Sequence, residues 1–327
     1  MKIVPLSLGA WNMHTLLDRS DSDRPQRKTA LIGRELTRYN INIAALSETR
    51  LTGEVKLCER GAGYTFFWSG RRSEDQSEAG VGFAEKTVFV NKLAGLPKGV
   101  NDRLMTMKLA LLNGRKHVTI ISAYAPTMAN PDETKDKFYE ELHSPITSVP
   151  KSDKLITLGD LSARAGSDNI SWEGVIGKYG AGCCNSNGLL LLQTCAEHEL
   201  LITNIVFCLP KATWMHPRSK HWHLTDYAIV RKRDRQDVQV TKSTCGAECW
   251  TDHRIVVSKL NIHIRPKRHP QGKKISKWLN ITKLKNLNSK TTSVSTLENH
   301  LQSTPLDIQN VEAAWTTLRE LVYNTAT

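Results

Sequence analysis

The chain has 327 residues and carries 45 Lys and Arg against 32 Asp and Glu, a formal net charge of +13. Its 39% hydrophobic fraction excludes a disordered or collagen-like chain. No stretch reaches the roughly 18 apolar residues of a membrane helix. The basic balance favours an acidic partner, nucleic acid before an anionic membrane, unless the charge lies on a solvated tail. Seven scattered cysteines predict free thiols in a reducing compartment.

Strand-like and helix-like segments alternate from the N-terminus to about residue 260, which predicts a mixed α/β domain. The Asn113-Gly114 pair lies between two apolar runs and is typical of a β-hairpin. In chain order we expect strands at 3–8, 41–46, 81–89, 104–111, 116–124, 155–158, 201–205, 224–230, 238–241 and 255–260, and helices at 27–39, 132–143 and 188–200.

The composition changes after residue 262. Between Arg265 and Lys290 there are nine Lys or Arg and no acidic residue, so this segment holds 9 of the 13 net charges. A helix is expected at Val311–Tyr323. We therefore divide the chain into one domain over 1–262, a basic linker over 263–290, and a small helical or disordered tail over 291–327.

Polar side chains stand where the predicted strands end. Carboxylates at the ends of apolar strands are costly unless they are paired or bind a metal. Hard divalent cations prefer such oxygen ligands, and a His oriented by a carboxylate can act as a general acid or base. Each residue alone is more often a turn or cap residue, but together they predict a phosphodiester-cleaving site. The residues are Asn12, Glu48, Tyr124, Asp160, Asp226, Asp252 and His253.

Six motifs in order carry a family resemblance. They are Trp11-Asn12, Ser47-Glu48-Thr49, Tyr124-Ala-Pro126, Gly159-Asp160-Leu-Ser-Ala-Arg164, Leu224-Thr-Asp226-Tyr227 and Thr251-Asp252-His253. This set resembles the endonuclease/exonuclease/phosphatase superfamily. The segments 120–127, 153–164, 186–205 and 214–223 look like the endonuclease of RTE/BovB-type LINE retrotransposons and a host protein derived from such an element. The resemblance covers about residues 3–275.

The resemblance implies a DNase I-like four-layer α/β sandwich, with two packed mixed sheets flanked by helices. It implies Mg²⁺, or Mn²⁺, held by Glu48 with Asn12 beside it and Asp252 as a second carboxylate. Asp160 would position or deprotonate the attacking water, and His253, oriented by Asp226, would stabilise the phosphate or transfer a proton. Tyr124 would donate to the phosphate. The implied reaction is water attack on a DNA phosphodiester, which leaves a nick with a 3′-hydroxyl.

The chain departs from the family pattern at Ser162, where the family has Asn. An Asn amide offers both a donor and an acceptor, whereas Ser has one shorter hydroxyl. Losing one preorganised donor typically costs about 10²–10³ in rate. The alternative is therefore a catalytically weakened copy that acts as a DNA-binding or interaction protein. A phosphatase acting on lipid or small-molecule phosphates is a third class on the same scaffold.

Candidate DNA contacts are basic residues near the motifs. Arg50 follows the metal carboxylate and is expected either to contact phosphate or to pair with an acid. Arg218 and Lys220 lie in a basic stretch with interleaved aromatic residues, which is typical either of a DNA-contacting loop or of a polar hairpin. We expect DNA as the partner, no membrane contact, a monomer, and an intracellular, nuclear location.

Overall fold

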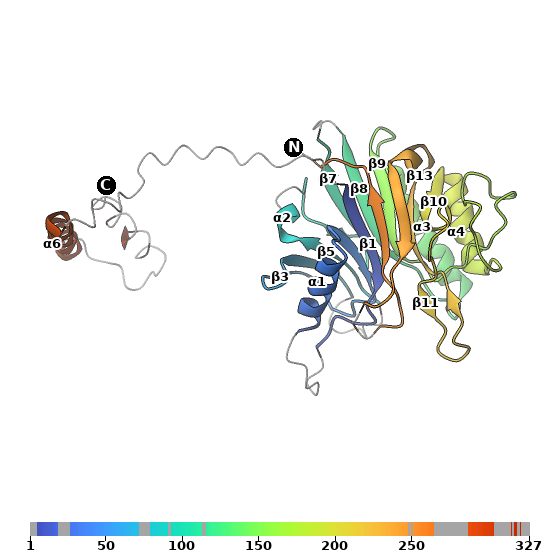
Figure 1. Ribbon diagram of the computed structural model, residues 1–327, viewed down its shortest axis with the longest axis horizontal. Helices are drawn as coiled ribbons and strands as arrows, with labels where there is room; N and C mark the ends of the chain where they lie inside the picture. Colours follow the sequence, from blue (N-terminus) through green and yellow to red (C-terminus); the bar gives the residue numbers. More distant parts are fainter. Residues whose placement is uncertain are drawn as a thin grey trace. The chain divides into compact units, whose positions relative to one another are not determined.

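The computed structural model describes residues 5–18, 27–71, 79–90, 93–112, 116–247, 249, 251–264 and 287–303, together with 315, 317, 318 and 321. The chain divides into two compact units, Met1–Lys267 and Arg268–Thr327. Figure 1 shows the first unit as packed sheets flanked by helices. Among the described residues, no helix combines the length and the apolar character that crossing a membrane requires.

Two large mixed sheets form the centre of the first unit. The first has seven strands in the order β14-β15-β1-β2-β5-β4-β3, and the second has six in the order β10-β13-β9-β8-β7-β6. The strands of the first are β1 (Leu6–Asn12), β2 (Ile43–Ser47), β3 (Glu54–Glu59), β4 (Tyr64–Ser69), β5 (Val81–Lys86), β14 (Val238–Ser243) and β15 (Val256–Leu260). Those of the second are β6 (Lys98–Gly99), β7 (Leu104–Ala110), β8 (His117–Tyr124), β9 (Lys154–Asp160), β10 (Leu200–Ile202) and β13 (Asp226–Arg231).

Helices cover the outer faces of both sheets. Ile32 and Leu36 of helix α1 (Lys28–Arg38) pack with Trp11 on the first sheet. Helices α3 (Asp132–Ser148) and α4 (Ser186–Glu197) pack on the second sheet around Phe138 and Leu191. The remaining elements are α2 (Thr87–Val90), η1 (Thr203–Ile205), η2 (Lys232–Asp237) and the hairpin β11 (Trp214–Met215) with β12 (Trp222–His223). The order helix, sheet, sheet, helix is the predicted four-layer sandwich, and the fold class is confirmed.

The central strands bury side chains on both faces. Ile120 of β8 packs between the two sheets, whereas its neighbour Ile121 packs under the outer helices. The same alternation places Ala228 in the inner core and Tyr227 in the outer one. Strands buried on both faces read as continuous apolar runs rather than alternating ones, which is why the sequence made them easy to locate.

Strand pairing brings the polar strand ends to one edge. β1 runs parallel to β2, with Asn12 opposite Ser47, and β8 runs parallel to β9, with Tyr124 opposite Asp160. β13 is antiparallel to β9, so its first residue, Asp226, also lies opposite Asp160. Gly159 allows this close pairing, because a Cβ there would lie 1.8 Å from the carbonyl oxygen of Ala123.

Some element boundaries differ from those predicted. The expected strand 81–89 ends at Lys86 and continues as helix α2, so residues 87–90 are helical. The predicted hairpin joins β7 to β8, although its turn at 113–115 lies outside the described residues. In the second unit, helix α6 spans Leu287–Ser303, from the end of the predicted basic linker into the tail predicted to be helical or disordered. The expected helix at 311–323 and most of the basic segment 265–290 lie outside the described residues, so the predicted domain boundaries remain a prediction.

Candidate active site

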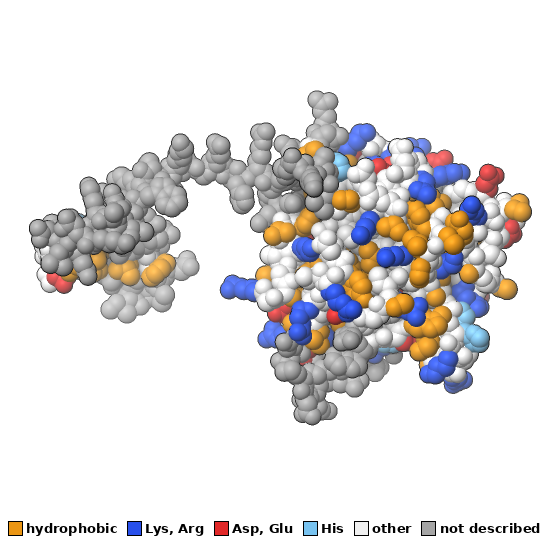
Figure 2. Space-filling view, in the orientation of Figure 1, with side chains coloured by type: hydrophobic (Ala, Val, Ile, Leu, Met, Phe, Trp, Pro, Cys, Tyr) orange, Lys and Arg blue, Asp and Glu red, His pale blue; other side chains and the backbone are white. Residues whose placement is uncertain are grey.

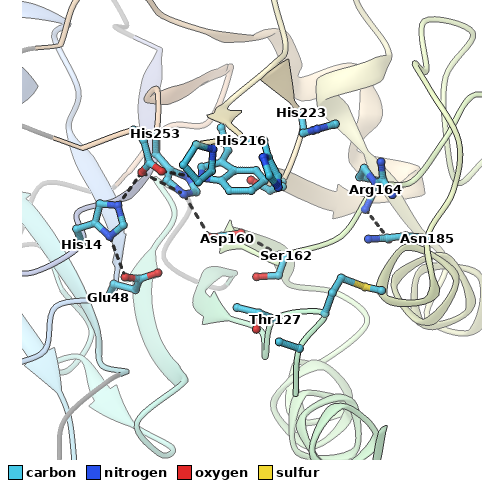
Figure 3. Close-up of a pocket in the computed structure, with 16 residues that line it drawn as sticks. His14, Glu48, Thr127, Asp160, Ser162, Arg164, Asn185, His216, His223 and His253 are labelled. Atoms are coloured by element: carbon cyan, nitrogen blue, oxygen red, sulfur yellow. Dashed lines mark hydrogen bonds and ion pairs between the residues drawn. The ribbon is translucent and has the colours of Figure 1, made fainter. Parts of the chain in front are cut away.

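A cleft of about 620 Å³ lies where the polar strand ends meet. Residues from both large sheets and from the β11–β12 hairpin line it, and Figure 3 shows their side chains converging on one space. The lining includes His14, Glu48, Thr127, Asp160, Ser162, Arg164, Asn185, Trp214, His216, His223, Asp252 and His253. Seven distant segments therefore contribute to one site, as the strand-end pattern predicted for its acidic residues.

The buried half of the cleft is a cluster of Asp160, Asp226 and His253, all less than 10% exposed. His253 Nδ1 lies 2.9 Å from Asp226 Oδ2, and His253 Nε2 lies 3.9 Å from Asp160 Oδ2. Burial opposes the charge on His253, but the Asp226 carboxylate outweighs it and raises the pKa of His253 to about 9. Burial, then the charge of Asp226, raises the pKa of Asp160.

Asn12 joins the two sides of the cleft. Its Nδ2 donates to Glu48 Oε1 and to Asp160 Oδ2, both at 2.9 Å. The hydroxyl of Tyr124 also donates to Glu48 Oε1, at 2.9 Å. Burial opposes the charge on Glu48, but hydrogen bonds from His14, Asn12 and Tyr124 outweigh it and lower the pKa of Glu48 to about 2. Glu48 is therefore an anion held in place by three neutral or cationic donors.

His14 is the residue that sequence reasoning missed. Its Nδ1 lies 3.3 Å from Glu48 Oε2 and its Nε2 lies 2.7 Å from Asp252 Oδ1, so one imidazole bridges both carboxylates (Figure 3). Its bonds to Asp252 and then to Glu48 raise the pKa of His14 to about 9. The ring is therefore a cation at neutral pH. The only indication of this role in the sequence was that His14 lies two residues after Asn12.

Asp252 is fixed by the hairpin. Trp214 Nε1 donates to Asp252 Oδ2 at 2.8 Å, and Trp214 forms an isolated bridge with His253. On the other side, Trp11 Nε1 donates to the carbonyl oxygen of His253 at 3.1 Å. Trp11 is fully buried. Two tryptophans thus hold the Asp252-His253 segment from opposite sides.

Ser162 lies on the cleft wall, and its hydroxyl makes only a weak contact. Its N–H donates to Asp160 Oδ1 at 2.8 Å, while its Oγ has only a long contact of 3.5 Å to the carbonyl oxygen of Ala125. Asn187 of α4 supports this loop by donating to the Ser162 carbonyl oxygen. The φ angle of Ser162 is 47°, a left-handed conformation that Asn adopts more readily than Ser.

Left-handed backbone recurs around the cleft. His14, Glu48 and Arg50 have φ angles of 58°, 54° and 53°. Such conformations in residues other than glycine cost of order 1–3 kcal/mol each and concentrate at functional sites. The local chain geometry therefore turns these three side chains in directions that a regular strand or turn would not give.

The predicted DNA-contacting residues are only partly at the cleft. Arg50 Nη2 lies 3.4 Å from Glu48 Oε2, so Arg50 pairs with an acid in this structure. Arg218 and Lys220 are exposed in the turn between β11 and β12, outside the cleft lining, whereas His216 and His223 of the same segment line it. Arg164, next to Asn185 in Figure 3, is a lining cation to which the sequence assigned no role.

Positive charge is distributed widely over the first unit. Figure 2 shows Lys and Arg side chains over the whole visible face rather than in one patch. The cleft itself combines Glu48, Asp160 and Asp252 with several imidazoles. The cleft therefore pairs its carboxylates with positive groups, including His14, His253 and Arg164.

Comparison with curated proteins shows one relative in two species. The chain is 29% identical over 262 residues to craniofacial development protein 2 of Bos taurus and 28% identical over 262 residues to that of Tragulus javanicus. These alignments cover 79% of this chain, and the chain spans about two-fifths of the length of these relatives, 41% and 42%. No family model matches the chain.

Solved structures share the fold at low identity. The endonuclease domain of TRAS1, a telomere-specific non-LTR retrotransposon, matches with TM-score 0.52 and 17% identity over 79% of this chain and 99% of that one. The catalytic domain of Xenopus laevis APE2 matches with TM-score 0.58 and 13% identity, covering 80% and 94%. The 3′ phosphatase NExo from Neisseria, bound to product DNA hairpin, matches with TM-score 0.52 and 15% identity, covering 78% and 99%. The chain thus has the fold of the endonuclease/exonuclease/phosphatase superfamily and resembles craniofacial development protein 2 in sequence.

Proposed function

We propose that the chain is a divalent-metal-dependent DNA endonuclease that hydrolyses phosphodiester bonds and leaves nicks. The observation that carries this proposal is the convergence of Asp226, His253 and Asp160 beside Glu48 and Asp252 in one cleft. The fold neighbours include nucleases and a phosphatase, one of them with bound DNA. Their shared chemistry at phosphate esters supports a hydrolase.

Glu48 and Asp252 would hold Mg²⁺ or Mn²⁺, with Asn12, whose Nδ2 donates to Glu48 Oε1, beside them. The fit rests on His14, whose two ring nitrogens lie 3.3 and 2.7 Å from one oxygen of each carboxylate. The two acids therefore already share one cation, and oxygen ligands of this kind suit hard divalent ions. When bound, the ion would neutralise charge on the phosphate as a Lewis acid.

Asp160 is the best-placed base for the attacking water. Its raised pKa makes it a better proton acceptor than an ordinary aspartate. Its Oδ2 accepts from Asn12 and its Oδ1 from the Ser162 N–H, so the carboxylate is fixed in orientation. This anchoring keeps Asp160 aimed at one position in the cleft, as proton abstraction from a positioned water requires.

His253 supplies positive charge opposite that base. Asp226 holds Nδ1, which leaves Nε2 directed toward the cleft at 3.9 Å from both Asp160 Oδ2 and Asp252 Oδ1. As an imidazolium it stabilises the phosphate as negative charge develops. Asp226 sets the ring orientation and the charge, so it acts through His253 rather than on the substrate.

The second candidate is a catalytically weakened copy that binds DNA. The observation that favours it is the Ser162 hydroxyl, which reaches only one long contact and lacks the amide donor expected at this position. A rate lower by about 10²–10³ is the usual effect of one lost donor. Both candidates keep the same cleft and the same partner, DNA, and they differ in turnover.

Nicking of supercoiled plasmid in Mg²⁺ separates the two candidates. The unchanged chain is compared with Glu48→Ala, Ser162→Asn and the matched exposed control Asp168→Asn, with folding of each checked by circular dichroism. The proposal expects nicking by the unchanged chain and by Asp168→Asn, and none by Glu48→Ala. If Ser162→Asn nicks faster than Glu48→Ala but the unchanged chain does not, the active-enzyme proposal is wrong for this chain. That result supports the weakened copy.

We also propose DNA-backbone contacts in the cleft wall and beside the cleft, a monomer, and a nuclear location. Exposed Arg218 and Lys220 beside the cleft, with Arg164 in its wall, support contacts to the DNA backbone. Removing one cation that binds a phosphate should lower the salt dependence of DNA binding by about one in log–log slope. Titrations of duplex DNA at several salt concentrations with Arg218→Ala and Lys220→Ala test this contribution.

A further inference from the structure

A second cluster of metal-ligating side chains lies on the outer helix layer. His143 extends from α3, and Glu197 and His198 stand at the end of α4. One ligand atom from each lies within 4.8 Å of those of the other two. The α4 helix has 12 residues, so at 1.5 Å per residue its two ends are about 18 Å apart. Because the first turn of α4 adjoins the cleft, this cluster is separate from the proposed active site.

The spacing within the cluster is close to that of a zinc site. His143 Nδ1 lies 3.5 Å from Glu197 Oε1, and the rings of His143 and His198 are 4.7 Å apart at 57°. Bonds of about 2.0–2.2 Å from Zn²⁺ to imidazole nitrogen and carboxylate oxygen place tetrahedral ligand atoms roughly 3.3–3.6 Å from one another. Two of the three ligands are therefore already at that separation, and the third has a ligand atom within 4.8 Å of both.

The surroundings of the cluster favour a cation. The adjoining hollow is lined by Asp136, Glu140 and Glu197 with the two histidines, and no Lys or Arg is among its lining residues. Basic residues do approach His198 from its other side, where Arg231 helps to line a second hollow.

His198 is suited to act as a neutral ligand. Its Nε2 is buried and has no hydrogen-bond partner within the described part of the chain. A metal ligand must be the neutral imidazole, and a buried nitrogen without a partner is otherwise costly.

From this geometry we infer that His143, Glu197 and His198 form a zinc-binding site that links α3 to α4. The donor set of two imidazoles and a carboxylate suits Zn²⁺, with Glu140 or water as a fourth ligand. His143 and Glu197 are half-exposed or more, which leaves the ion a path from solvent. The role is structural, because α4 also supports the cleft loop: Asn185 accepts from the Arg164 N–H and Asn187 donates to the Ser162 carbonyl oxygen.

Calorimetric titration with Zn²⁺ tests the site on the full chain without an affinity tag. The proposed cleft also binds divalent ions, so the titration uses Glu48→Ala as its background. One Zn²⁺ per chain is expected there, and adding His143→Ala or His198→Ala should weaken it at least about tenfold, as loss of a ligand does. His263→Ala, which changes a histidine outside the cluster, serves as the matched control and should leave the affinity unchanged.

Two further measurements distinguish the loss of a metal ligand from the loss of folding. Co²⁺ bound to the Glu48→Ala chain should give visible absorption bands that disappear in Glu48→Ala/His143→Gln, while the circular dichroism stays unchanged. Saturating Zn²⁺ should raise the Tm of the Glu48→Ala chain, since a ligand that binds only the folded state stabilises it, and not that of Glu48→Ala/His143→Ala. If Zn²⁺ bound with equal stoichiometry and affinity with and without His143 and His198, the inference would be overturned. Because every arm carries Glu48→Ala and the arms differ only outside the cleft, this outcome is independent of the proposed endonuclease activity.

Discussion

The two halves of the cleft are held by different means. In the buried half, Asp160, Asp226 and His253 are less than 10% exposed and are fixed by paired strands. In the outer half, Glu48 and Asp252 are bridged by His14, whose side chain is 45% exposed. Burial makes the first half sensitive to any missing partner, whereas solvent screens the second. Under the proposed function, catalysis would depend on the inner half, and the outer half would adjust ion binding.

The largest effect should follow from changing the inner base. Asp160→Asn keeps the shape but removes the proton acceptor, so plasmid nicking should fall by about 10²–10⁴-fold. Asp168→Asn, on an exposed loop, is the matched control and should leave the rate unchanged. A nicking rate in Asp160→Asn within about threefold of the unchanged chain would contradict the assignment of the base.

The next effect should be a gain at Ser162. Ser162→Asn restores an amide donor and also suits the left-handed backbone at φ 47°, so nicking should rise by about 10–10²-fold. Ser162→Ala supplies the control, because the long Oγ contact of 3.5 Å predicts little loss on removing the hydroxyl. If Ser162→Asn and Ser162→Ala have equal rates, the missing amide does not limit the enzyme.

A shift in pH dependence should follow from changing the partner of His253. With its pKa raised from an ordinary 6.5 to about 9, His253 stays charged until the pH passes about 9, where activity should fall. Asp226→Asn should move this alkaline limb down by about 1–2 pH units, since the neighbouring carboxylate is lost. A pH profile of nicking measures the shift, and Asp234→Asn is the distant control.

The raised pKa of His253 also makes the stability of the fold depend on pH. His253 binds its proton more tightly in the folded state, so its contribution is fully present below pH 6.5 and is lost as the pH rises through about 9. The Tm difference between the unchanged chain and Asp226→Asn should therefore be largest near pH 6 and narrow toward pH 9 and above. A difference independent of pH would indicate that Asp226 does not hold the charge on His253.

The smallest effect should arise in the outer half. His14→Gln removes the imidazolium that competes for Glu48 and Asp252, so Mg²⁺ should bind about 3–10-fold more tightly, as expected for losing one like charge at a partly exposed site. Calorimetry at pH 7 measures this, with His216→Gln as the control on the opposite wall. Weaker binding in His14→Gln would instead identify His14 as a ligand, and the two halves would then be more alike.

Much of the fold was predictable because the core strands are buried on both faces. Apolar runs such as Ile43–Ser47 and His117–Tyr124 were visible without knowledge of their partners. The hairpin β3–β4 was not predicted, because Glu54–Glu59 carries alternating charged residues on an edge strand. Helix α3 extends to Ser148 through Pro145, beyond the predicted end at residue 143, because packing of Ile146 on the outer core outweighs the local preference of proline.

Some residues of the candidate site could be predicted from their positions at strand ends, and others could not. Asn12, Glu48, Tyr124 and Asp160 follow strand ends, and parallel strands end at one edge, so their convergence could be expected. Arg50 had two possible partners in the sequence, and the structure pairs it with Glu48. Arg164 and Asn185 entered the cleft wall without any local signal, because α4 packs its first turn against the loop after β9.

By itself the sequence determined the main candidates for the chemistry, because carboxylates and a histidine at apolar strand ends are too costly to stand there unpaired. It also determined the sandwich, through strands that are apolar on both faces. Only the tertiary structure decided the charges and the partners. His14 lies two residues after Asn12, yet its charge depends on Asp252, which approaches through the pairing of β1 with β15. Pairwise electrostatics depend on distances of a few ångströms, and those are set by folding rather than by order along the chain.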